Sequence, residues 1–146
     1  MADPIVHPYE TLTTRDGQHV EIDEALVPVI RDLWRLGFRT LACCQDVGEA
    51  TAAVRAQADR PLGYGAENFI AFHRGWALLK LPLLDAMRLV DLLATEPLFA
   101  RRVGLRWRPG CWRMNVPLEP NGLSDAALLH FPVRQIPELA DVLLGR

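Results

Sequence analysis

The sequence predicts an α+β fold, a two-layer sandwich in which helices cover one face of a mainly antiparallel sheet. Two observations support this prediction. Strand-like and helix-like segments alternate in mixed order along the 146 residues, and one strand–Pro–helix pattern occurs twice. The length suits a single domain over 1–146. The first ten residues fit no periodic pattern, so we expect a loose N-terminal segment over 1–10.

The repeated pattern lies at 77–94 and 127–144. Within it, "LLKLP" over 78–82 matches "LLHFP" over 128–132, and an amphipathic segment follows each. Proline suits the first turn of a helix, so both copies read as a strand that enters a helix. A duplicated strand–helix unit favours a ferredoxin-like arrangement of the sheet.

The remaining elements follow from local signals. Alternation around the turn at Asp16-Gly17 predicts a hairpin, and helical spacing between Asp23 and Gly37 predicts a helix with those residues at its ends. The expected order beyond this helix is as follows: a strand over 38–44, a helix over 46–60, a loop over 61–68, a strand at the apolar run 69–72, and two strands over 103–109 and 111–119 joined at Pro109-Gly110.

Composition narrows the functional classes. The sequence has no apolar run of the roughly 20 residues that span a bilayer and no signal-peptide pattern, so we expect a cytoplasmic protein without a membrane partner. Its three cysteines are then thiols rather than a disulfide framework. The formal net charge of −2 argues against non-specific DNA binding.

The stretch "TLACCQD" over 40–46 carries two adjacent cysteines at the predicted strand-to-helix junction. Cys44 would lie near the N-terminus of the helix, where free N–H groups lower a thiol pKa and favour a nucleophile or a metal ligand. Gln45 could donate to an oxyanion. Asp46 opposes this arrangement, because its charge raises the thiol pKa. The structural alternative makes Cys43 a buried strand residue and Cys44 a small filler.

A catalytic cysteine needs a base, and we expect His73 or His130 to supply it. The structural alternatives are a loop position for His73 and an edge or capping position for His130. His7 and His19 read as surface residues. Arg74, next to His73, would anchor an anionic substrate. Adjacent cysteines on a strand point to opposite faces, so the zinc signal is weak and no metal ligand is assigned.

A second candidate surface is the segment "RRVGLRWRPGCWR" over 101–113. Arg106 and Arg108 would share one face of a strand, with Trp107 on the other. Arginine forks with aromatic faces suit a nucleotide, nucleic acid or phosphorylated metabolite. The alternative is a packed Trp107 and a solvated arginine face. P-loop, dinucleotide-binding, zincin and nucleophile-elbow motifs are absent from the sequence, so it indicates no cofactor.

The segment "IDEALVPVIRDLWRLGFRTLACCQD" and the closing "LLHFPVRQIPELADVL" resemble those of small uncharacterised bacterial and phage proteins. These share a helix ending "LWxxG" and a strand "T-x-x-[SC]-C-Q". The resemblance covers the first 46 residues and about the last 20. It implies a single small domain of this fold and assigns no activity.

Two functional hypotheses follow. The first is a small cytoplasmic enzyme or ligand-handling protein with a pocket around Cys44, Gln45, His73, Arg74 and His130 that takes an anionic small molecule or nucleotide. The second is a non-catalytic binding module that uses the arginine–tryptophan segment for a protein partner, nucleotide or nucleic acid. The sequence leaves the oligomeric state open, a homodimer included.

Overall fold

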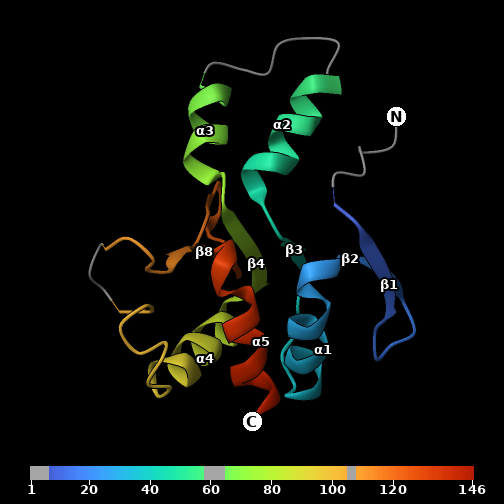
Figure 1. Cartoon of the computed structure of the whole chain (residues 1–146), viewed down its shortest axis with the longest axis vertical. Coiled ribbons are helices and arrows are strands. Elements are labelled where there is room, and N and C mark those ends of the chain that lie inside the picture. Colours follow the sequence, from blue (N-terminus) through green and yellow to red (C-terminus); the bar gives the residue numbers. More distant parts are fainter. Residues whose placement is uncertain (1–6, 58–64, 105–107) are drawn as a thin grey trace.

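The protein forms an α+β fold around one four-stranded antiparallel sheet, which confirms the predicted fold class (Figure 1). The computed structural model describes residues 7–57, 65–104 and 108–146. The strands of this sheet, in spatial order, are β3 (Ala42–Cys44), β4 (Trp76–Pro82), β8 (Ala126–Pro132) and β5 (Arg113–Asn115). The helices are α1 (Val27–Arg35), α2 (Val47–Gln57), α3 (Ala66–His73), α4 (Leu83–Ala94) and α5 (Ile136–Leu144).

The two copies of the strand–Pro–helix pattern form the centre of the sheet. They are β4 followed by α4, and β8 followed by a short 3-10 helix (Val133–Gln135) and α5. Leu79 and Leu129, which are equivalent in the two copies, face each other in the antiparallel register. An approximate two-fold axis therefore passes between these two leucines. The predicted duplication is thus also a structural one.

The strand order agrees with the ferredoxin-like expectation. Strands β4 and β5 run parallel to each other, are connected through α4, and have β8 inserted between them, which makes a split βαβ unit. The edge position beside β4 is filled by β3, which comes earlier in the chain. A small hairpin of β6 (Leu118–Glu119) and β7 (Gly122–Leu123) connects β5 to β8.

The core lies between one face of the sheet and helices α1, α4 and α5. Alternation along β4 buries Ala77, Leu79 and Leu81 on this face, as period-2 strand geometry requires. Each of the three helices contributes fully buried side chains: Val29, Ile30, Leu33, Ala86, Leu89, Leu93, Leu139 and Leu143. Helices α2 and α3 instead stand beyond the end of the sheet, side by side (Figure 1). This end carries the candidate site.

The predicted N-terminal elements are confirmed. β1 (Tyr9–Thr13) pairs with β2 (His19–Asp23), and a 3-10 turn (Glu24–Leu26) leads into α1. Gly37 ends α1 with φ +86°, and the Phe38 N–H donates to the Leu33 carbonyl at 2.9 Å, the bonding of a Schellman motif. The loose segment expected over 1–10 falls partly on residues 1–6, outside the described residues. From Tyr9 onward the chain is already in β1.

One predicted strand is wrong, and a second is contradicted at its two described ends. The run "FIAF" lies in α3, because a four-residue apolar run cannot by itself distinguish a buried strand from a helix. In the predicted strand over 103–109, residues 103–104 and 108–109 are turn or irregular backbone, and 105–107 lie outside the described residues. In the part of the chain that the structure describes, no helix is long and apolar enough to cross a bilayer.

Candidate metal centre

The candidate site is built on the junction between β3 and α2. Cys44 is the last residue of β3, and α2 begins three residues later. Asp46 caps this helix, because its carboxylate accepts a hydrogen bond from the Glu49 N–H at 3.0 Å. Its second oxygen accepts the Gly75 N–H at 2.9 Å, so one side chain holds the β3–α2 and α3–β4 junctions together. The predicted place of Cys44, close to a helix N-terminus, is confirmed.

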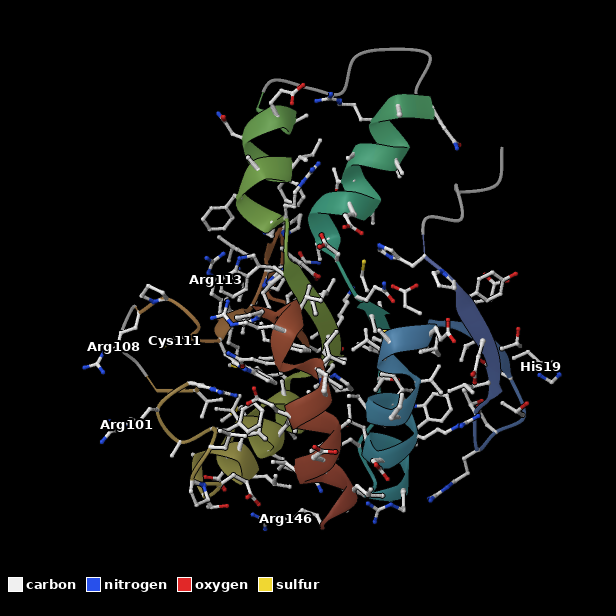
Figure 2. All side chains as sticks on the ribbon, viewed as in Figure 1. His19, Arg101, Arg108, Cys111, Arg113 and Arg146 are labelled. Carbon is white, nitrogen blue, oxygen red and sulfur yellow. The ribbon has the colours of Figure 1, made fainter. Side chains whose placement is uncertain are left out.

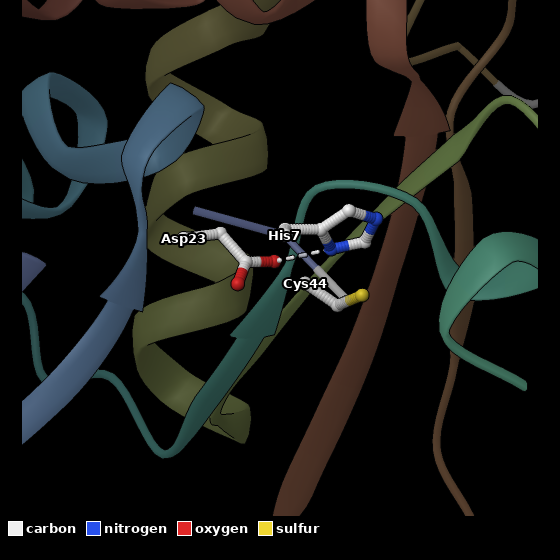
Figure 3. A group of neighbouring side chains, drawn as sticks. All are labelled: His7, Asp23 and Cys44. Atoms are coloured by element: carbon white, nitrogen blue, oxygen red, sulfur yellow. Dashed lines mark hydrogen bonds and ion pairs between the residues drawn. The ribbon is translucent and has the colours of Figure 1, made fainter. Parts of the chain in front are cut away.

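Three potential ligands converge here from separate parts of the chain. The side chains of His7, Asp23 and Cys44 each offer one atom, and these atoms all lie within 4.8 Å of one another (Figure 3). His7 precedes β1, Asp23 ends β2, and Cys44 ends β3. The Gln45 N–H positions Asp23, since it donates at 2.8 Å to Oδ2, the same oxygen that contacts His7. The cluster therefore depends on the tertiary fold.

His7 lies between two carboxylates. Its Nδ1 is 3.2 Å from Asp23 Oδ2 and its Nε2 is 3.0 Å from Glu49 Oε2, and its side chain is only 6% exposed. A neutral imidazole has one N–H, so it cannot donate to both acceptors. The arrangement is satisfied by a doubly protonated ring, or by a cation between one ring nitrogen and its carboxylate. His7 was expected at the surface, and this expectation is wrong.

The two thiols differ in orientation and resist ionisation. Cys43 packs against the core, whereas Cys44 lies on the opposite face with the cluster. Burial raises the pKa of Cys44 to about 11. The Asp46 N–H opposes this rise, while the charges of Asp23 and Asp46 add to it. Burial likewise raises the pKa of Cys43 to about 12, with Asp23 adding to it. The expected lowered pKa of Cys44 is therefore wrong: burial outweighs the helix N-terminus.

The donor set fits a borderline divalent cation. Imidazole nitrogen, thiolate sulfur and carboxylate oxygen are zinc ligands, with bond lengths of about 2.0–2.3 Å. Ligand atoms around tetrahedral zinc lie roughly 3.3–3.7 Å apart, so closing on an ion needs movements on the order of 1 Å. A metal-binding histidine usually donates its other N–H to a carboxylate, which is the role that Glu49 could take. From the sequence we assigned no metal ligand, and we did not consider these three residues together.

The remaining residues of the predicted pocket form a separate group. His73, at the end of α3, contacts His130 of β8 with ring centroids 5.1 Å apart and the rings tilted by 54°. Arg113 of β5 lies opposite His130 in the register and stacks on Trp76 at 3.7 Å and Phe72 at 4.2 Å from the ring centroids. Arg74 is exposed. The imidazole grouped with the Cys44 thiol is therefore that of His7, in place of the expected His73 or His130.

Gln45 stays beside the site, although in an unexpected role. Its backbone N–H orients Asp23, and its side-chain oxygen is buried without a hydrogen-bond donor among the described residues. An unsatisfied buried oxygen costs about 1–3 kcal/mol. The predicted oxyanion donation by Gln45 stays a prediction.

The arginine–tryptophan segment is described only in part. Arg106 and Trp107 lie outside the described residues. Arg108 is exposed and points away from the molecule, whereas Arg113 turns toward it (Figure 2). Trp112, in contrast, is buried and donates to Gln135 Oε1 at 2.9 Å. The predicted anion-binding face over 106–108 therefore stays a prediction.

Sequence reasoning missed His7, Asp23 and Glu49. Asp23 was read only as a helix cap, and a histidine between Val6 and Pro8 shows no periodic pattern. The contact between His7 and Glu49 joins residues 42 apart in the chain. The one available signal was that Asp23, Cys44 and Asp46 each lie at the end of a predicted element.

Comparison with protein-family models, curated proteins and solved structures finds no match to this chain. The resemblance to small bacterial and phage proteins thus stays an expectation from the sequence. The function has to be argued from the site.

Proposed function

We propose that this chain is a divalent-metal-binding protein, with zinc as the best-fitting ion, and that the metal serves a small-molecule reaction or binding event. The observation that carries the proposal is the convergence of His7, Asp23 and Cys44 with Glu49 behind the imidazole. Three protein ligands leave a fourth position, the pattern of catalytic rather than structural zinc sites. Zinc in such a site lowers the pKa of a bound water to about 7, which supplies a nucleophile at neutral pH.

The raised pKa of Cys44 supports a ligand role over that of a free nucleophile. A thiol with a pKa of about 11 is almost fully protonated at neutral pH. A bound cation removes this obstacle, because a coordinating thiol is deprotonated outright. The same burial that makes the free thiol inert gives the ion a site of low dielectric. Metal uptake should therefore release a proton at pH 7.

Cobalt binding tests the proposal directly. We expect Co²⁺ to bind with one equivalent per chain and to give a thiolate charge-transfer band in the near ultraviolet. C44S should lose the band, whereas C43S, which alters the adjacent thiol on the core face, should keep it. Wild-type protein that binds Co²⁺ without the thiolate band, or fails to bind it, would refute the proposed centre. Metal analysis of the purified protein gives the resident ion.

A second candidate function is thiol catalysis, the form in which the sequence first suggested an enzyme. Cys44, His7 and Asp23 have the composition of a cysteine–histidine–carboxylate triad, and the His7–Asp23 hydrogen bond favours it. In this structure the other ring nitrogen of His7 faces Glu49 rather than Cys44, so a triad would need the imidazole to exchange that contact. The pH profile of iodoacetamide labelling of metal-free protein decides between the two. Labelling of Cys44 with a midpoint near 11 supports the metal ligand, and a midpoint below 8 supports the nucleophile.

The wider predictions concern context. A centre with a thiol ligand suits a reducing compartment, which agrees with the predicted cytoplasmic location. An anionic small molecule or nucleotide as ligand, a partner on the arginine–tryptophan segment and a homodimer stay predictions.

A further inference from the structure

The sheet places the metal centre and the histidine pair on one face. Across the ladder, Cys44 pairs with Leu78, Leu78 with His130, and His130 with Arg113. Directly paired residues in a sheet point to the same face. The core side chains Leu79 and Leu129 occupy the opposite face. Cys44 and His130 are two strands apart, roughly 10 Å at the usual strand spacing.

His130 is a largely buried side chain whose ring contacts that of His73. It is 7% exposed, and its ring nitrogens are not among the buried atoms left without a hydrogen-bond partner, so among the described residues they stay open to water or a ligand. Burial lowers the pKa of His130 to about 4, with the neighbouring His73 and Arg113 adding to the effect. Buried polar groups are nearly always satisfied by protein, water or a ligand. A ligand that replaces water at the His130 ring would lie beside the positive charge of Arg113.

The neighbours of His130 define the chemistry of that partner. His73 Nδ1 donates to the Phe69 carbonyl of its own helix at 3.0 Å, so Nε2 can donate to an external acceptor only when the ring carries both protons. The Arg113 guanidinium lies over the rings of Phe72 and Trp76, which places its positive charge beside the two imidazoles. An N–H of His130, the Nε2–H of a doubly protonated His73 and the nearby positive charge of Arg113 suit an oxyanion, which would accept hydrogen bonds from the two imidazoles.

We propose that the molecule handled by the metal centre carries an oxyanion, phosphate or carboxylate, that binds between His73 and His130 beside Arg113. This inference rests on the proposed metal centre and specifies its substrate class. The ligand extends from the open metal position over Leu78 to the histidine pair. Its metal-binding group and its anion are therefore roughly 10 Å apart.

Phosphorus relaxation in Co²⁺-loaded protein measures this arrangement with inorganic phosphate as the probe. We expect saturable binding and a cobalt–phosphorus distance of about 10 Å, from the two strand spacings. H130Q and H73Q should each weaken phosphate binding about tenfold, the effect of one lost charge-assisted hydrogen bond. Both variants should leave the cobalt spectrum unchanged. R88Q removes an exposed positive charge on α4 and should leave phosphate binding intact.

The outcomes separate this inference from the metal centre itself. A cobalt–phosphorus distance near 3 Å, or equal binding by H130Q and wild type, would overturn the inference while the metal centre stands. If cobalt fails to bind, phosphate titration of the metal-free protein decides: loss of binding in H130Q supports the oxyanion site, and no difference refutes it. Parallel titration with acetate tells whether phosphate or carboxylate is preferred.

Discussion

The two halves of the sheet share a framework and differ in what they carry. The pair β3–β4 and the pair β5–β8 are related by the approximate two-fold axis between Leu79 and Leu129. Under this relation Cys44 corresponds to Asn115, and Lys80 corresponds to His130. In one half the strands are connected by α2 and α3, and in the other by the small β6–β7 hairpin.

The difference separates the shared core from the candidate ligands. The paired leucines of the core are the same in both halves, whereas the ligands come from strand ends, connections and the N-terminal segment. His7 and Glu49 have no counterpart among the described residues of the second half. Stability should therefore respond equally to changes in the two halves, and metal binding to changes in one half only.

The largest expected effect tests the shared core. L79A and L129A each remove a fully buried leucine on the two-fold axis, so each should lower the free energy of unfolding by about 2–5 kcal/mol. Urea denaturation measures both values. Costs that differ by more than about 2 kcal/mol would show that the halves are not equivalent in packing.

The next effect tests the asymmetry of the site. C44S should weaken Co²⁺ or Zn²⁺ binding by a factor on the order of 10²–10³, because a hydroxyl is a poor replacement for a thiolate ligand. N115S alters the equivalent position of the other half and should leave affinity unchanged. Competition with a chelator measures both. Equal losses in the two variants would contradict a site confined to one half.

The next prediction concerns how the free energy of unfolding depends on pH through His130. Its pKa is about 4 in the folded protein and near 6.5 in the unfolded chain, so between these values only the unfolded chain takes up the proton. The free energy of unfolding should therefore fall as pH is lowered from 6.5 to 4, by about 3 kcal/mol. H130Q should remove this slope, while K80Q, at the equivalent position, should keep it. Denaturation series at several pH values provide the measurement.

The smallest effect concerns the carboxylate behind His7. E49Q should lower metal affinity about tenfold, because outer carboxylates orient the histidine and increase its basicity. Its side chain is 54% exposed, which places the effect at the lower end of the usual range. Calorimetric titration of E49Q against E67Q, a carboxylate change on α3, checks it. A loss in E67Q of the same size would point to net charge rather than to Glu49.

The sequence predicted those parts of the molecule that follow from local patterns. Periodicity around Leu33 and the proline entries to two helices predicted the elements, and the duplication predicted the symmetric sheet. The position of Cys44 at a strand-to-helix junction was also predictable, since Asp46 is a strong cap. These features depend on neighbours within a few residues.

The site itself required contacts that no local pattern encodes. His7 meets Asp23 and Glu49, 16 and 42 residues away, across the fold. The pKa of Cys44 depends on burial by such distant segments, so the helix N-terminus alone gave the wrong direction. His73 was expected after a strand but ends a helix, because the apolar run at 69–72 is too short to distinguish the two periodicities.

Gly48, the second residue of α2, has a further consequence for the candidate site. A Cβ built at this position would lie 2.4 Å from the Arg74 backbone nitrogen and 2.7 Å from the Ile70 carbonyl oxygen. The backbone at the start of α2 thus packs directly against the backbone at the end of α3, with no side chain between them. Displacement of one segment must be passed to the other, so a shift of the β3–α2 junction next to Cys44 also moves the α3–β4 junction next to His73.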